Sequence, residues 1–374
     1  MNLYDVIIVG GGLAGLTAAI HLRRKNYHVL VIEKEPYPHH KVCGEYLSNE
    51  VLPYLNSLDV HLPTTISIDT LEFSSQKGSL LRLSLPLGGV GISRYALDHT
   101  LYEKALETGA TVIFETVSSV NFKSSAFTVE TDNNIKYTAT FVLGAYGKRS
   151  NLDKFFKRPF FSEKSPWLGV KAHYTIPDFP DNEVGLHNFE GGYAGLSKTE
   201  TGAVNFCYLT TYKSFQQAGN INSFNEAVVA KNPFLRAFLD EATPLFDSPL
   251  SIAQISFEPK KSIEDHMLMC GDTAGLIHPL CGNGMAIAIH SAKIASEMID
   301  DYFQNSNITR EELEIRYQQK WSQVFRNRLR MGRYLQSLLM RPLVANALLS
   351  TVAKSPRLLS EIVKRTHGKL IEGL

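Results

Sequence analysis

The chain has 374 residues, of which 44% are hydrophobic and 20% are charged, and its formal net charge is +1 at pH 7. This length and apolar content allow more than one buried core and favour about two domains. A net charge so close to zero gives no electrostatic reason to expect nucleic acid as a partner. The four cysteines show no CxxC spacing, so we expect no disulfide framework and a reducing, cytoplasmic location.

The N-terminal part of the chain has the pattern of a dinucleotide-binding βαβ unit. Apolar runs predict strands over 4–9 and 28–32, and a helical pattern lies between them over 14–24. Glycines in GxGxxG spacing separate the first strand from the helix, which gives a tight turn and lets a pyrophosphate approach the helix N-terminus. Glu33 after the second strand favours a free ribose 2′-hydroxyl, as in FAD or NAD. The candidate cofactor contacts of this unit are Gly10, Gly12, Ala14, Gly15, Glu33 and Lys34.

The middle of the chain alternates between strand and helix patterns. The expected strands lie over 70–73, 79–85, 111–115, 127–131, 135–140 and 141–145, and a helix is expected over 95–108. The residues between 131 and 135 predict a hairpin turn. From 155 to 257 the pattern is rich in strands and aromatic residues, which favours an apolar substrate pocket, although aromatic residues on strands usually form sheet core. These aromatic residues include Trp167, Tyr174, Phe189, Tyr193, Phe206 and Tyr208.

A second glycine-rich motif runs from Gly271 to Gly284, between a buried strand expected over 266–270 and a helix expected over 286–303. Asp272 follows the end of the strand, where open α/β sheets bind ligands, and it can accept hydrogen bonds from a polyol chain. The glycines let the backbone approach a flat ring, and the N-terminus of the helix would stabilise the negative charge of a reduced flavin. The two motifs together predict FAD as the cofactor.

Five motifs are spread along nearly the whole chain: Gly10–Gly15 with Glu33, Lys41–Glu45, Ser93–Asp98, Gly144–Gly147 and Gly271–Gly284. They resemble those of the FAD-dependent oxidoreductases of the aromatic-hydroxylase superfamily, and within it the geranylgeranyl reductase branch. The resemblance implies that Arg94 and the backbone near Val117 contact FAD, that Asp272 holds the ribityl chain, and that Cys43 and Gly44 lie beside the isoalloxazine. The further FAD contacts assigned to the second motif are Pro279, Gly282, Asn283, Gly284 and Met285.

The chain departs from this family pattern in two places. Tyr146 stands where the superfamily usually has an aspartate, which puts direct reduction by NAD(P)H in doubt and makes a protein electron donor the alternative. The tyrosine-tryptophan-phenylalanine-proline-lysine signature of the reductase branch is reduced to Tyr193 and Lys198 in the stretch 192–198. Smaller side chains at the other positions predict a pocket for a different substrate.

The predicted fold is α/β, with a Rossmann-like FAD-binding domain, an inserted β-sheet substrate domain and C-terminal helices. We assign 1–58, 88–154 and 258–309 to the FAD-binding domain, 59–87 and 155–257 to the substrate domain, and 310–374 to the helical region.

The C-terminal region carries a net charge of +8, so the rest of the chain carries −7. Trp321, Phe325, Leu329, Leu335, Leu338 and Leu339 recur at near-helical spacing among arginines, which predicts amphipathic helices. We expect their apolar stripe to pack on the FAD-binding domain. A weak peripheral contact with anionic lipid is the alternative.

Three residues are candidates for catalysis. Cys43 beside the flavin is a redox thiol, a proton relay or simply a small apolar residue that fits the ring. His278 precedes Pro279 and is either a proton donor at the edge of the ring or a structural histidine, and Tyr193 belongs to the substrate-domain signature. His39 and His40 with Cys43 and Glu45 match no zinc spacing, so no metal is expected.

Three functions remain open for a small apolar substrate, isoprenoid-like or polyketide-like. A reductase would transfer hydride from flavin N5 to a carbon–carbon double bond, and we favour it because of the Cys43-Gly44-Glu45 loop and the retained Tyr193 and Lys198. A monooxygenase that hydroxylates an aromatic or polyketide substrate comes second. A non-enzymatic lipid escort with the same fold comes third, since it would not need an intact flavin motif. The tryptophan-x-tryptophan-x-isoleucine-proline motif of flavin halogenases is absent.

Overall fold

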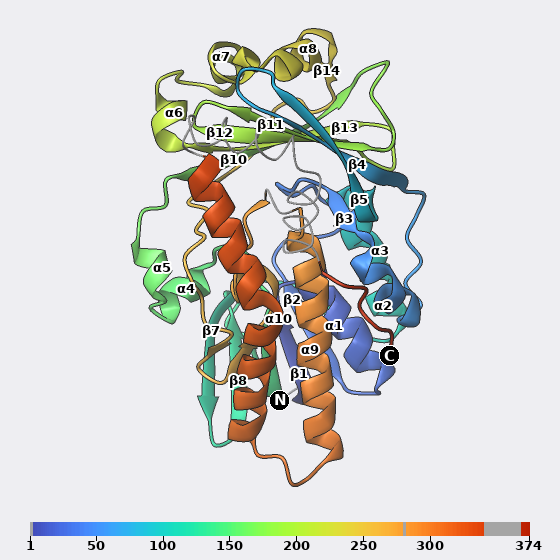
Figure 1. The fold of residues 1–374 in the computed structure, drawn as a ribbon. Coiled ribbons are helices and arrows are strands. Elements are labelled where there is room, and N and C mark those ends of the chain that lie inside the picture. The colour runs from blue at the N-terminus through green and yellow to red at the C-terminus, as the bar shows by residue number, and fades with distance from the viewer. Residues whose placement is uncertain (1–2, 280–281, 340–367) are drawn as a thin grey trace.

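The computed structural model describes residues 3–279, 282–339 and 368–374, which form two β-sheets and the helices around them (Figure 1). The strands of the first sheet are β1 Leu3–Val9, β2 Val29–Glu33, β6 Thr111–Phe114, β7 Val117–Lys123, β8 Ala126–Thr131, β9 Lys136–Gly144, β16 Ile263–Glu264 and β17 Met267–Met269. The strands of the second sheet are β3 Tyr46–Ser48, β4 Ile66–Ser74, β5 Leu80–Gly91, β10 Trp167–Thr175, β11 Glu183–Phe189, β12 Gly192–Lys198, β13 Val204–Thr211, β14 Thr243–Pro244 and β15 Leu250–Ala253. The helices are α1 Leu13–Arg24, α2 Leu52–Ser57, α3 Arg94–Glu107, α4 Asn151–Phe155, α5 Pro159–Ser162, α6 Tyr212–Gln216, α7 Ile221–Ala227, α8 Pro233–Glu241, α9 Gly284–Gln304 and α10 Arg310–Leu339, with 3₁₀ turns at Asn49–Val51, Val229–Lys231 and Gly271–Thr273.

The first sheet is the predicted Rossmann-like sheet. Its strands follow the order β16-β17-β9-β1-β2-β6, and β17, β9, β1, β2 and β6 run parallel to one another. The residues of β2 are all buried, as are the last four of β1, because helices cover the sheet and leave these strands little access to water. The α/β fold class predicted from the sequence is therefore confirmed.

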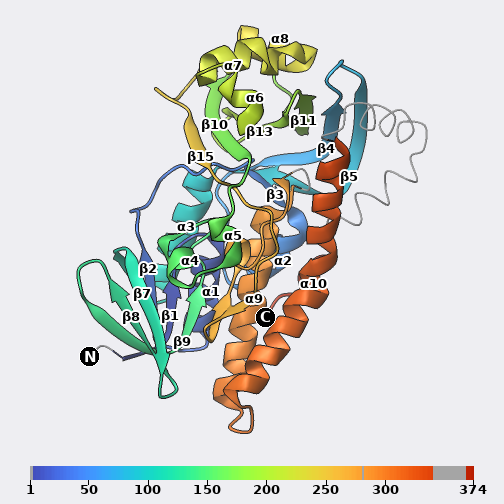
Figure 2. The same ribbon diagram turned by 90° about the vertical axis from the view of Figure 1, so that its left-hand side faces the viewer.

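Helix α10 packs on the helical layer that covers this sheet. α10 lies beside α9 along the molecule (Figures 1 and 2). A stripe at four-residue spacing is buried in the same core as the first sheet: Leu313, Tyr317, Trp321, Phe325 and Leu329. The expected packing of the apolar stripe is thus confirmed for Trp321, Phe325 and Leu329, whereas Leu335 and Leu338 are half-buried and do not belong to this core. The rest of the predicted helical region, over 340–367, lies outside the described residues. Within the described ranges, no helix has the length and apolar character needed to cross a membrane.

The second sheet has two different faces. Helices α6, α7 and α8 cover the face that points away from the first sheet (Figure 1), and four of the six aromatic residues considered for the substrate pocket form the core beneath them: Tyr174, Phe189, Phe206 and Tyr208. The opposite face carries Tyr193 and Leu209, with Trp167 packed against them. Only this second face adjoins the glycine motifs, because Leu276 belongs to the same cluster.

Several predicted elements differ from the observed ones. The stretches 135–140 and 141–145 form one strand, β9, which pairs with β8 from Lys136 to Ala139 and with β1 from Thr138 to Gly144. Strand β7 was not predicted, and 155–257 contains helices α5 to α8 besides its strands. Sheet membership also does not follow the predicted boundaries at 58 and 88, since β3 and the end of β5 pair within the second sheet. Sheet pairing alone does not define domains, so the division into domains stays a prediction.

Candidate flavin site

The two glycine motifs meet at the carboxyl edge of the first sheet. Because β1, β2, β9 and β17 are parallel, Gly10, Glu33 and Asp272 all lie where strands end. Gly271 has a φ of +59°, and a Cβ there would lie 3.3 Å from the Cβ of Ala14. The start of α1 and the second motif are therefore in contact, although they are far apart in the sequence.

The first turn has glycines that packing requires, Gly10 and Gly15 among them, and one, Gly12, that faces open space. A Cβ on Gly15 would collide with the carbonyl oxygen of Gly10, whose φ is +102°. A Cβ on Gly12 would meet only the Arg94 guanidinium, at 3.7 Å. Gly12 is also the N-cap of α1 and makes no side-chain cap. The first backbone N–H groups of the helix therefore remain available to donate hydrogen bonds to a ligand. This open turn fits a pyrophosphate.

Glu33 lies at the nucleotide end of the site. Its carboxylate accepts hydrogen bonds from the backbone N–H groups of Gly11, at 2.6 Å, and of Lys34, at 3.0 Å. Its carbonyl oxygen accepts from Glu115 N, two residues before Val117, so the two predicted contacts are brought to one end. Tyr37, which sequence analysis missed, donates its hydroxyl to Gly11 O and stacks on Tyr102, 4.5 Å between ring centroids. Lys34 itself is exposed.

The second motif offers a carboxylate and a second helix N-terminus. Gly271 N donates to Ser291 Oγ at 2.8 Å, and the carbonyl oxygen of Asp272 accepts from Lys260 Nζ at 2.8 Å. The Asp272 carboxylate is half-buried. Burial lowers the pKa of Lys260 to about 8, against the opposing effect of Asp272.

Helix α9 begins at Gly284 with Asn283 as its N-cap, and the Asn283 side chain makes no cap hydrogen bond. Met285 is buried, Pro279 is exposed, and Gly282 has a φ of +61° beside the Tyr46 ring. Two uncapped helix N-termini, an open glycine and a half-buried carboxylate along one sheet edge fit an FAD molecule. The individual contacts of these residues with FAD stay predictions.

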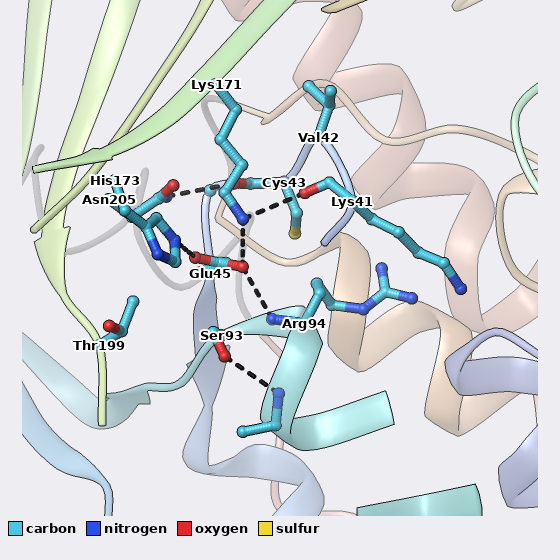
Figure 3. A network of polar contacts seen from close by, with 12 residues as sticks. Lys41, Val42, Cys43, Glu45, Ser93, Arg94, Lys171, His173, Thr199 and Asn205 are labelled. Atoms are coloured by element: carbon cyan, nitrogen blue, oxygen red, sulfur yellow. Dashed lines mark hydrogen bonds and ion pairs between the residues drawn. The ribbon is translucent and has the colours of Figure 1, made fainter. Parts of the chain in front are cut away.

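The loop predicted to lie beside the isoalloxazine ends in a buried network of charges (Figure 3). Glu45 is completely buried and is bound by the Lys171 ammonium, by His173 Nε2 at 2.6 Å and by the backbone N–H of Arg94 at 2.8 Å. Burial alone would raise the pKa of Glu45, but the hydrogen bond from His173 and the charge of Lys171 outweigh it and hold the pKa below its usual value.

Arg94, implied to contact FAD, is fixed by a second ion pair. Its guanidinium binds the Asp98 carboxylate through two hydrogen bonds of 2.6 and 2.7 Å, and Lys41 Nζ reaches the same carboxylate at 2.9 Å. Burial would raise the pKa of Asp98, but the two cations lower it. The Arg94 side chain thus lies fixed beside Gly12, at the place expected for the pyrophosphate.

The charge network also contains a group with the composition of a metal site. Ligand atoms of His40, Glu45 and His173 lie within 4.8 Å of one another. The Lys171 ammonium already pairs with the Glu45 carboxylate, however, and its positive charge would repel a divalent cation placed among these ligand atoms. We therefore read the group as a charge network. His39, Cys43 and His40 do not come together as a ligand set.

Two of the three catalytic candidates, His278 and Tyr193, lie together, while Cys43 lies on the loop Lys41–Gly44. His278 is buried against the rings of Phe257, Tyr193 and Trp167, with centroids 4.7, 5.6 and 6.2 Å away. Burial lowers its pKa to about 3, so the imidazole is neutral near pH 7. Tyr193 is buried on the face of the second sheet that adjoins the motifs, and Cys43 is a half-buried free thiol.

Tyr146 and Lys198, from the two stretches in which the chain departs from the family pattern, both make polar contacts. The Tyr146 hydroxyl accepts a hydrogen bond from buried Arg158 at 3.5 Å, and burial together with Asp153 raises its pKa. Lys198 pairs with exposed Asp181 at 2.5 Å, away from Tyr193 on the preceding part of the strand. Tyr146 is therefore a neutral phenol whose oxygen faces the Arg158 guanidinium, whereas an aspartate at this position would carry a negative charge.

Sequence analysis missed Lys171, His173 and Asn205. All three lie on the face of the second sheet that meets the loop, because Lys171 pairs with Cys207 and His173 with Asn205 across β10 and β13. A signal was present in the sequence of β10, where Lys171 and His173 alternate with apolar residues. In a strand buried on both faces, such polar residues must find partners.

Two family profiles match parts of the chain. The profile of the NAD(P)-binding Rossmann-like domain matches residues 8–45, which contain the first glycine motif. A squalene epoxidase profile matches residues 229–338.

Relatives that match most of the chain include reductases. Conditioned medium factor receptor 1 of Dictyostelium discoideum is 23% identical over 94% of this chain and 74% of its own length. Digeranylgeranylglycerophospholipid reductase 2 of Methanothermobacter thermautotrophicus is 24% identical over 85% of this chain and 83% of its own. The menaquinone reductase of Mycobacterium tuberculosis is 23% identical over 79% and 76%, respectively.

Solved structures share the fold over nearly the full chain. The flavin-dependent brominase Bmp2 superposes with a TM-score of 0.79 at 17% identity, covering 98% of this chain and 93% of its own. A geranylgeranyl bacteriochlorophyll reductase-like protein from Thermoplasma acidophilum gives 0.74 at 18% identity, covering 98% and 100%. Two classes of flavoenzyme chemistry thus share this fold, so the fold does not choose between them.

Proposed function

Because the chain is an FAD-dependent oxidoreductase of the geranylgeranyl reductase-like branch, we propose that it reduces a carbon–carbon double bond in a prenyl-bearing, apolar substrate. The observation that carries this proposal is the run of relatives named as reductases of digeranylgeranylglycerophospholipids and of menaquinone, which match 79–86% of the chain. The names of those relatives refer to substrates with long isoprenoid chains. When bound, FAD supplies the hydride, from N5.

The chain's own residues supply the apolar surroundings. Trp167, Tyr193 and Leu209 lie on the face of the second sheet that adjoins the second motif, where Leu276 and Phe257 complete the cluster. Such a surface binds an isoprenoid chain by burial of apolar area and excludes water from the reacting carbons. The neutral imidazole of His278 lies within this cluster and adds no charge to it.

Reduction of the double bond also requires a proton for the second carbon. Among the three candidates, His278 is neutral and therefore holds a single ring proton near pH 7. Cys43 and Tyr193 are the other two candidates, because a thiol and a phenol are side chains with a proton to donate. Single substitutions Cys43→Ala, Tyr193→Phe and His278→Gln will identify the donor by which of them lowers the rate of substrate reduction while FAD content is unchanged.

The electron donor is proposed to be a small redox protein. Support comes from Tyr146, which replaces the aspartate that many members use with a nicotinamide, and from the single dinucleotide-binding unit predicted in the sequence. We expect NADH and NADPH to reduce the flavin slowly. Fast, stoichiometric bleaching of the flavin by NADPH alone, at the rate of turnover, would contradict this part of the proposal.

The test of the function is anaerobic. Holoprotein reduced by light or dithionite is mixed with a geranylgeranyl lipid or with menaquinone, and the product is analysed by mass spectrometry. We expect the flavin to return to its oxidised spectrum as the substrate gains hydrogen at a prenyl double bond. If no substrate is reduced while FAD is bound, the reductase assignment fails.

A monooxygenase is the second candidate, and one observation favours it. The squalene epoxidase profile matches residues 229–338, and squalene epoxidase by its name acts with oxygen on an isoprenoid. The same assay in the presence of labelled O₂ separates the two functions. Product that contains the label would replace the reductase by the monooxygenase.

A peripheral contact with anionic lipid remains a separate proposal, supported by the excess of positive charge in 310–374. The measurement is cosedimentation of the holoprotein with anionic and neutral vesicles at low and high salt. Binding to anionic vesicles that disappears at high salt would support it, and equal partitioning with both vesicle types would contradict it.

A further inference from the structure

The loop Lys41–Gly44 is held by side chains at every one of its carbonyl groups. Lys171 Nζ donates to Lys41 O at 3.2 Å, Lys148 Nζ to Val42 O at 3.1 Å, Asn205 Nδ2 to Cys43 O at 3.1 Å and Ser197 Oγ to Gly44 O at 3.4 Å. Three of these donors come from β10, β12 and β13 of the second sheet, and Lys148 follows Gly147 near the first sheet. An irregular segment between two sheets is thereby fixed without strand pairing.

The end of the loop is fixed by charge. Glu45 has a φ of +56°, a left-handed conformation that residues with a side chain adopt uncommonly. Its carboxylate is completely buried, where it binds Lys171, His173 and the N-terminus of α3 at Arg94 (Figure 3). The same carboxylate thus joins the loop to both β10 and α3.

Lys171 is the residue that connects the two sets of contacts. It is completely buried, and its ammonium binds both Lys41 O at the start of the loop and the Glu45 carboxylate at its end. Burial of a charged lysine costs free energy. A buried ion pair is also weak evidence for a stabilising role, because apolar residues of similar size in its place often give a protein of equal or greater stability. The geometry of Lys171 indicates instead that it specifies the shape of the loop.

We propose that Lys171 is a positioning residue, which holds Cys43 and Gly44 at the flavin through its contacts with Lys41 O and Glu45. The proposal deepens the proposed function and rests on FAD lying against this loop. Its consequence is that the peptide groups of the loop keep a fixed orientation toward the cofactor, which sets the electrostatic surroundings that tune a flavin.

The test uses the flavin as its own reporter. Lys171→Met removes the cation and both hydrogen bonds, Lys171→Arg keeps charge and donors, and Lys231→Met is the control for loss of a lysine from an exposed ion pair in the same part of the chain. FAD content, the visible spectrum and the two-electron midpoint potential are measured for each purified holoprotein. Substrate reduction is measured separately, at saturating and limiting substrate.

For Lys171→Met we expect retained FAD, a shifted visible spectrum and a more negative midpoint potential, because the Glu45 carboxylate loses its counter-ion near the flavin. Turnover should fall by about 10- to 100-fold at saturating substrate, the effect of a small misplacement at a reacting centre. Lys171→Arg should recover most of the spectrum and potential, and Lys231→Met should match the parent protein.

A second variant keeps the test decisive if Lys171→Met fails to fold. Lys148→Met removes the hydrogen bond to Val42 O and leaves no buried charge without a partner. The spectrum and midpoint potential of this variant should therefore shift less than those of Lys171→Met. Parent values of spectrum, potential and turnover in Lys171→Met, or in Lys148→Met where the former is insoluble, would overturn the proposal. A shifted spectrum in a protein whose parent reduces no prenyl substrate would leave the positioning role standing and reject the proposed function.

Discussion

The two ends of the flavin site are built by different means. At the nucleotide end, backbone geometry makes the site: Gly10 and Gly15 pack closely, Gly12 stays open, and an uncapped helix offers its N–H groups. At the loop end, side chains from distant strands hold the backbone, with Glu45 and Lys171 as the buried pair. The first kind of site depends on close packing of backbone, as where a Cβ on Gly10 would meet the carbonyl oxygen of Ala145 at the end of β9. The second depends on charges that arrive only when both sheets have formed.

The largest expected effect breaks the nucleotide end. Gly12→Val should abolish FAD retention, because a branched side chain would fill the open turn in which a pyrophosphate fits. The fold should persist, since a Cβ on Gly12 meets only Arg94, at 3.7 Å. The measurement is the FAD-to-protein ratio together with the far-ultraviolet circular dichroism.

Gly15→Val provides the matched contrast. Its Cβ would collide with the carbonyl oxygen of Gly10, so this variant should lose the fold as well as the cofactor. A folded Gly12→Val protein with full flavin content would show that the turn does not bind the cofactor.

This contrast also explains how much the sequence could predict. The glycine spacing, the acid after β2 and the strand before the second motif are local patterns, and they predicted the Rossmann-like sheet and the meeting of both motifs at one edge. Lys171 lies 126 residues from Glu45, and Asn205 lies 162 residues from Cys43. No periodicity in the sequence pairs residues at such distances, so the polar network needed the register of β10 and β13.

The aromatic residues of the second sheet show the same limit. Alternation along β13 separates Phe206 and Tyr208 from Leu209, but only the placement of α6 to α8 decides which face is core. The continuous strand β9 was divided in the prediction because its start alternates polar and apolar residues beside β8, while its end is a continuous apolar run beside β1 and β17. Tyr37 was missed because nothing in the sequence near it indicates that it turns back to Gly11.

Acid should weaken the whole molecule, core and site alike. Burial lowers the pKa of His21, His187 and His290 to about 4 and that of His278 to about 3, against 6.5 for an unperturbed histidine. The unfolded chain therefore binds more protons than the folded one between about pH 6.5 and these values, so the free energy of unfolding is maintained above pH 6.5 and falls as pH drops through this window.

Urea unfolding at several pH values checks this expectation. We expect the midpoint to fall steadily from pH 7 to pH 4, with a flatter slope in His187→Gln, which removes one buried imidazole. A midpoint that stays constant from pH 7 to pH 4 in the parent protein would show that these histidines are not buried in the neutral form.

The two faces of the second sheet predict opposite phenotypes. Tyr208→Ala opens the core beneath α6 to α8 and should lower the free energy of unfolding by about 3–5 kcal/mol, the usual effect of removing a buried ring. Trp167→Ala, at a half-buried position on the opposite face, should affect the Michaelis constant for the apolar substrate more than stability. Thermal unfolding and steady-state kinetics measure the pair. Equal stability losses with unchanged kinetics would mean that both residues serve only as core.

The smallest expected effect refines the comparison at the second motif. Asp272→Ala should retain the fold and weaken FAD binding by about 1–3 kcal/mol, because a half-buried carboxylate that can accept ribityl hydrogen bonds is lost while both helix N-termini remain. Asp272→Asn should recover part of the affinity, since its amide oxygen still accepts a hydrogen bond.

The dissociation constant of FAD, measured by fluorescence on reconstituted apoprotein, is the readout. Each 1.4 kcal/mol corresponds to tenfold in that constant, so the loss should be roughly 5- to 150-fold. An unchanged constant in Asp272→Ala would place the ribityl chain away from this carboxylate and leave the uncapped N-terminus of α9 as the contact of the second motif with the cofactor.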